Sequence, residues 1–97
     1  DLPKVSIDTA STTSVDFKIF ASKFNVIQYF IWSSSSSSET TESVTTSGSA
    51  TSVFVLKNQL VEFTVTHATN IVAGEYIHIV AVDSEGSFSQ VISSSVV

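Results

Sequence analysis

The sequence predicts an all-β protein of seven or eight short strands, arranged as an antiparallel β-sandwich, with a small barrel as the alternative. Three observations carry this prediction. Apolar and polar residues alternate with a period of two along nearly the whole chain. Runs rich in β-branched residues recur at intervals of roughly 8–12 residues. No window shows sustained i, i+3, i+4 spacing of apolar residues, so we expect no helix.

The first half of the chain supplies three candidate strands. In "KVSID" and "SVDFKIF", apolar residues take every second position, as in strands with one buried face. The next run, "NVIQYFIW", is apolar on both faces, which suits a central strand or one with a second covered face. Within it, Phe30 and Trp32 share one face and Tyr29 lies on the other.

A Ser/Thr-rich polar segment spans residues 33–52 and opens with six consecutive serines. Its composition predicts a solvated connection, and O-glycosylation or a contact surface is the functional alternative. Residues Thr40–Thr46 could form a polar edge strand within this segment, because threonine favours strands.

The second half predicts two hairpins. The runs "SVFVL" and "LVEFTVT" are separated by the polar residues Lys57–Gln59, which indicates the first hairpin. In the second, "EYIHIVAVD" is followed by an acidic, glycine-containing turn and by "SFSQVISSSVV". The two ends of the chain, Leu2–Asp8 and Val91–Val97, predict edge strands with unpaired backbone groups.

Composition excludes several classes of function. The 97 residues amount to one domain, so we treat 1–97 as a single unit. A net charge of −5, with lysine as the only strong base, argues against nucleic acid and anionic membrane surfaces as partners. The absence of cysteine excludes disulfides, thiolate nucleophiles and cysteine-ligated metals. No apolar run approaches the roughly 18 residues that a membrane-spanning helix needs.

Reactive groups are few and do not form a known catalytic pattern. The sequence has no Gly-x-Ser-x-Gly motif, and His67 and His78 lack the spacing of zinc ligands. Asp83 and Glu85 flank a turn but provide too few carboxylates for a calcium site. We therefore expect no enzyme, no cofactor and no catalytic or metal-binding residue.

The stretch "AGEYIHIVAVDSEGSFSQVIS" resembles the last two strands of fibronectin type III domains. Gly74–Tyr76 match the start of the family's penultimate strand, Ala81–Asp83 its end, and Glu85–Gly86 the following turn. The segment "LPKVSIDTASTTSVDFKIFAS" looks like the opening proline and first two strands of the family. The variants that it most resembles come from Bacteroidetes surface proteins, and immunoglobulin-like sandwiches are near relatives.

The resemblance implies structural roles for two residues. Tyr76 would be the tyrosine-corner residue, whose hydroxyl bonds to nearby backbone. Ile19 would take a core position that many members fill with tryptophan. Phe30 and Trp32 are candidate contact residues if they are exposed, and packing in the core is the competing role.

These features together imply a non-enzymatic structural or interaction module, a spacer or adhesion domain of an extracellular, cell-surface or virion-surface assembly. The expected partner is a protein, or a second copy of the chain, bound through edge strands or loops. The alternatives are a carbohydrate-binding module or an accessory domain of a secreted glycoside hydrolase. The chain contains no methionine, which predicts a processed mature chain, for instance after removal of a secretory signal, or a piece of a longer polypeptide.

Overall fold

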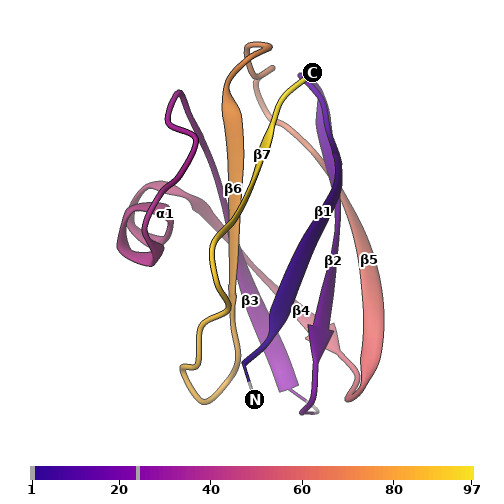
Figure 1. The fold of residues 1–97 in the computed structure, drawn as a ribbon. Coiled ribbons are helices and arrows are strands. Elements are labelled where there is room, and N and C mark those ends of the chain that lie inside the picture. Colours follow the sequence, from indigo (N-terminus) through magenta and orange to yellow (C-terminus); the bar gives the residue numbers. More distant parts are fainter. Residues whose placement is uncertain (1, 24) are drawn as a thin grey trace.

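Two antiparallel sheets face each other in the computed structural model, which describes residues 2–23 and 25–97 (Figure 1). The three-stranded sheet has the order β1 (Lys4–Ala10), β2 (Ser14–Ala21), β5 (Gln59–Thr66). The four-stranded sheet has the order β4 (Ser49–Val55), β3 (Asn25–Ser34), β6 (Tyr76–Val82), β7 (Ile92–Ser95). The predicted antiparallel sandwich is therefore confirmed, and strands β1 and β7 at the two ends of the chain lie at sheet edges.

The core lies between the sheets and follows the alternation of the sequence. On β2, Val15, Phe17 and Ile19 point inward and are fully buried, while the residues between them are partly exposed. From β3, the ring of Tyr29 packs edge-on against Phe17, with 5.1 Å between the ring centroids. These contacts join the two sheets.

Polar pairs occupy the outer face of the three-stranded sheet. The ammonium of Lys18 on β2 lies 3.3 Å from the carboxylate of Asp8 and 3.9 Å from that of Glu62. On the same strand, Asp16 accepts hydrogen bonds from Thr64 (2.7 Å) and Thr9 (2.8 Å), which lower the pKa of its carboxyl group. This face is built for contact with water.

A short helix, α1 (Thr41–Ser47), corrects the prediction that residues Thr40–Thr46 form an edge strand and that the chain has no helix. Thr40 caps the helix: its side chain accepts a hydrogen bond from the backbone of Ser43, and the Ser43 side chain bonds back to the Thr40 backbone. Val44 is fully buried, so the helix forms because this one side chain finds a partner surface in the tertiary structure.

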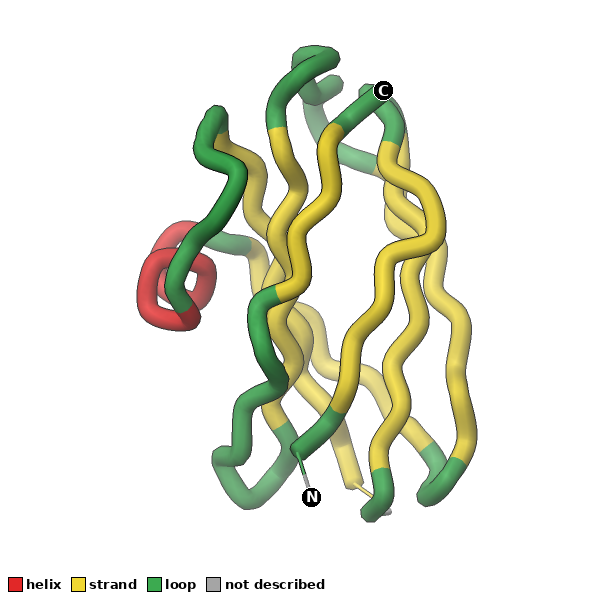
Figure 2. The backbone as a smooth tube through the Cα atoms, viewed as in Figure 1, coloured by secondary structure: helices red, strands yellow, loops and turns green. Residues whose placement is uncertain are grey.

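The helix packs on the outer face of the four-stranded sheet, against β3 and β6 (Figure 2). This explains why both strands are apolar on both faces: their inner side chains fill the core, and part of their outer face lies under α1. Val80, on the outer face of β6, is fully buried although it takes no part in the main core. The helix ends at Gly48, where an added Cβ would lie 2.5 Å from the carbonyl oxygen of Val44.

The hairpin predicted around Lys57–Gln59 is wrong, because β4 and β5 belong to different sheets. The chain crosses from one sheet to the other there, and Asn58, with φ of 60°, makes the turn. Its amide donates to the carbonyl of Ala21 (2.8 Å), so the crossing is tied to the end of β2. The second predicted hairpin is confirmed: β6 pairs with β7 in antiparallel fashion.

Candidate functional site

A hydrogen-bonded chain of side chains surrounds His78 on the outer face of the four-stranded sheet. The imidazole is fully buried, with Nδ1 2.7 Å from the Ser93 hydroxyl and Nε2 2.9 Å from that of Ser34. Ser34 in turn donates to the carboxylate of Glu39 (2.8 Å). Because the single hydroxyl proton of Ser34 goes to Glu39, Nε2 of His78 donates to Ser34 and Nδ1 accepts from Ser93.

This network holds together β3, β6, β7 and the segment that leads into α1. Burial lowers the pKa of His78, and the negative charge of Glu39 and a backbone hydrogen bond at Ser36 oppose part of that shift. Serine, histidine and glutamate also occur in hydrolase sites, but here the carboxylate contacts Ser34 and not the imidazole. The imidazole is fully buried, and its hydrogen bonds with Ser34 and Ser93 connect β6 to β3 and to β7.

The residues that the sequence singled out lie in different places. Ile19 is fully buried in the core. Phe30 and Trp32 are half-buried on the outer face of β3, and the Trp32 ring lies 6.0 Å from that of His78. Tyr76 opens β6 and is half-buried, and its hydroxyl makes no hydrogen bond with the described residues. The corner role of Tyr76 stays a prediction.

The turn after β6 uses its acidic groups internally. Asp83 is buried, and its carboxylate accepts hydrogen bonds from the backbone amides of Glu85 (2.9 Å) and Ser87 (3.0 Å). Glu85 forms an ion pair with Lys23, which lies between β2 and β3. This pairing raises the pKa of the lysine. Across residues 2–23 and 25–97, no group of three or more His, Asp or Glu side chains is placed to hold a metal ion.

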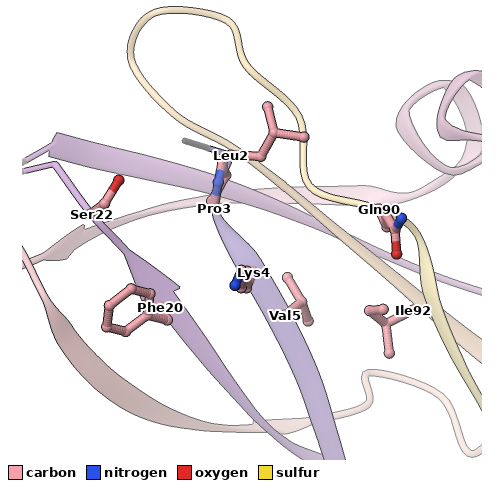
Figure 3. A pocket seen from close by; sticks show the side chains of 8 residues that line it. All are labelled: Leu2, Pro3, Lys4, Val5, Phe20, Ser22, Gln90 and Ile92. Atoms are coloured by element: carbon pink, nitrogen blue, oxygen red, sulfur yellow. The ribbon is translucent and has the colours of Figure 1, made fainter.

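An apolar groove opens along the edge formed by the start of β1 and the approach to β7 (Figure 3). This edge groove has a volume of about 640 Å³, within the range of small-molecule sites. Val5 and Ile92 lie next to each other in the lining, and Lys4 is the only charged side chain among the described lining residues. It is lined by Leu2, Pro3, Lys4, Val5, Phe20, Ser22, Gln90 and Ile92.

The groove exists because β1 and the C-terminal segment approach each other at one end only. Near the C-terminus, the amide of Val97 donates to the carbonyl of Ala10 (3.2 Å) and joins the two sheets. At the other end, β7 begins only at Ile92. The segment before it is held to β6 by the bridge between Val82 and Phe88 and by hydrogen bonds between Ser89 and Ala81. Sequence alternation located both edge strands but could not show this divergence.

Large apolar side chains are also exposed around the crossing between β4 and β5. Val26 and Phe54 are paired across strands on the outer face of the four-stranded sheet, and both are more than half exposed. Leu56, which follows β4, and Leu60, on β5 in the other sheet, are exposed as well.

Comparison of the chain with protein families, with curated proteins and with solved structures finds no match. Within the described part of the chain, no helix has the length and apolar character needed to cross a membrane.

Proposed function

We propose that the chain is a non-enzymatic structural or interaction module, of the fibronectin type III kind, in an extracellular, cell-surface or virion-surface assembly. Strand order supports the family assignment. In constant-type immunoglobulin domains the fourth strand joins the sheet of the first two. Here β4 pairs with β3 in the other sheet, which favours the fibronectin type III relative over the immunoglobulin one.

The edge groove is the observation that carries the interaction role. Its floor is apolar, and it lies where two edge strands, β1 and β7, face each other. An extended segment of a neighbouring protein can add to such an edge, with backbone hydrogen bonds for affinity and apolar side chains for the groove. A second copy of the chain or a larger scaffold would be the partner.

The test is the molar mass of the chain in solution as a function of concentration, measured by light scattering after gel filtration. We expect the mass to rise with concentration for the wild-type chain. Leu2→Glu places a charge in the edge groove and should return the chain to a monomer, because burying an unpaired carboxylate is costly.

Val72→Glu is the matched control. Val72 is more exposed than Leu2, at 68% against 54%, and does not line the groove. The same charge is therefore added outside the proposed contact, and the association should persist. A wild-type chain that stays monomeric at every concentration, or an equal effect of both variants, would contradict pairing of copies through the groove and leave a spacer role.

A further inference from the structure

A second cavity, of about 390 Å³, lies between the sheets, beside β4 and the segment after β5. It is at the opposite end of the sandwich from the edge groove. Among the described residues, its walls carry seven hydroxyl groups and one imidazole but no Lys, Asp or Glu. It is lined by Tyr29, Ile31, Trp32, Ser33, Ser47, Ser49, Thr51, Val65, Thr66, His67, Ala68, Thr69 and Ile71. We call this the hydroxyl pocket.

The sequence of β4 explains why the pocket exists. Thr51 pairs with Tyr29, and Ser49 with Ile31, so both lie on the same side of the sheet as Val53 and Val55. Unlike the buried Val55, Ser49 and Thr51 are exposed. The valines fill the space between the sheets at one end, whereas the smaller hydroxyl residues leave it open at the other. The hydroxyls of Ser49 and Thr51 are therefore open to solvent where they line the pocket, and a ligand can reach them.

Tyr29 provides a buried polar group without a partner. Its side chain is 6% exposed, and its ring is held by Phe17 and by Phe63, whose centroid lies 5.8 Å away. The hydroxyl forms no hydrogen bond with the described residues, although Tyr29 lines the pocket. Buried hydroxyls are nearly always paired, so a group from outside the chain is expected to bond to this one.

His67 faces the pocket with a defined tautomer. Its Nε2 lies 3.2 Å from the carbonyl oxygen of Ser11. A carbonyl can only accept, so Nε2 carries the proton, and in the neutral ring Nδ1 is left as an acceptor. The pocket thus combines an acceptor at His67 with hydroxyls at Tyr29, Ser49 and Thr51, and with apolar surface from Val65.

We infer that the hydroxyl pocket binds a neutral saccharide unit. A sugar ring has a rim of hydroxyls that both donate and accept and faces of C–H groups, which matches walls of hydroxyls, one imidazole acceptor and aliphatic side chains. The lack of charged lining residues selects against acidic or basic ligands. This site is separate from the edge groove and from the outer face that carries Phe30, and it does not depend on the proposed function.

The experiment is a titration of the 15N-labelled chain with D-glucose, D-galactose, D-mannose or N-acetyl-D-glucosamine, followed by amide chemical shifts. A single ring held by a few neutral hydrogen bonds should bind with a Kd of about 1–10 mM. We expect at least one sugar to give saturable shifts at Ser49, Thr51 and His67. Glycerol, a polyol without a ring, should bind at least about tenfold more weakly.

Tyr29→Phe and Ser49→Ala each remove one pocket hydroxyl and should weaken sugar binding by about tenfold. Ser52→Ala is the matched control, because Ser52 lies on the same strand but pairs with Gln28, on the outer face. It should leave binding unchanged. Circular dichroism confirms that each variant is folded before titration.

Three results would overturn the inference. No saturable shift with any of the sugars would mean that the pocket holds only water. Shifts confined to the outer face around Phe30, which does not line the pocket, would place a saccharide elsewhere. Equal weakening by Ser49→Ala and Ser52→Ala, or binding of glycerol as tight as that of the sugars, would show that the pocket does not recognise a sugar ring.

Discussion

At the scale of single residues, His78 is a buried polar side chain whose hydrogen bonds connect β6 to β3 and to β7. Hydroxyls of Ser34 and Ser93 satisfy both ring nitrogens of the neutral imidazole. A proton on this ring would add a charge in a fully buried position, which burial disfavours. The network is therefore stable in one protonation state and weaker in the other.

We expect the free energy of unfolding to decrease as the pH is lowered through about 6.5. Burial holds the folded-state pKa of His78 below its ordinary value of 6.5. Between these two pKa values the unfolded chain binds more protons than the folded chain, so acid favours unfolding. The contribution is complete above pH 6.5 and is lost as the pH falls towards and through the folded-state pKa. Urea unfolding at a series of pH values measures it.

A variant at His78 separates this effect from other titrations. His78→Gln retains a side chain that can donate and accept but does not titrate, so the decrease between about pH 7 and 5 should shrink. If His78→Gln left the pH dependence unchanged, another group would be responsible.

Tyr76→Phe tests the corner role that the family resemblance implies. The Tyr76 hydroxyl has no hydrogen-bond partner among the described residues, and the side chain is half-buried. We therefore expect its removal to change the free energy of unfolding by less than about 0.5 kcal/mol. Chemical denaturation provides the value. A loss of about 1 kcal/mol or more would instead show that the hydroxyl makes the corner bond in solution.

At the scale of elements, α1 depends on the sheet beneath it. Seven residues are too few for a helix that is stable by itself, and three of them are threonine, a weak helix former. What compensates is the capping box at Thr40 and the burial of Val44 against the outer face of β3 and β6. Glu39 links the first turn of α1 to β3, because its carboxylate accepts hydrogen bonds from Ser43 in the helix and from Ser34 on β3.

Val44→Ala should therefore lower the free energy of unfolding by about 2 kcal/mol, from lost apolar burial and the cavity left behind. Thr46→Ala is the control on the same helix, since Thr46 is exposed and also β-branched. Its effect should stay within about 0.5 kcal/mol. Urea denaturation compares the two, and equal effects would mean that α1 is not packed as described.

At the scale of the whole molecule, the sandwich is assembled from pairings between strands far apart in the chain. β2 pairs with β5 across about forty residues, and β3 pairs with β6 across a similar span. We expect refolding in milliseconds to seconds, the range of all-β sandwiches, because loop closure must precede these contacts. Stopped-flow fluorescence of Trp32 measures the rate, and relaxation in microseconds would contradict this picture.

The alternation of apolar and polar residues predicted which faces of the strands are buried. The buried positions of β2, from Val15 to Ile19, and the pairing of β6 with β7 follow from the local period of two and from turn residues. The two apolar faces of "NVIQYFIW" also indicated a second covered surface, which α1 provides in part. These features depend on neighbours within a few positions, so a single sequence contains them.

What the sequence by itself determined is thus the fold class, the buried faces and the edge position of both ends. Tertiary structure alone decided that β4 and β5 lie in different sheets, that Val44 nucleates a helix, and that His78 meets Ser34 and Ser93. It also placed Ser49 and Thr51 beside Tyr29 and so opened the hydroxyl pocket. The physical reason is register: which side chains meet across strands is set by the packing of the whole core, and local periodicity does not encode it.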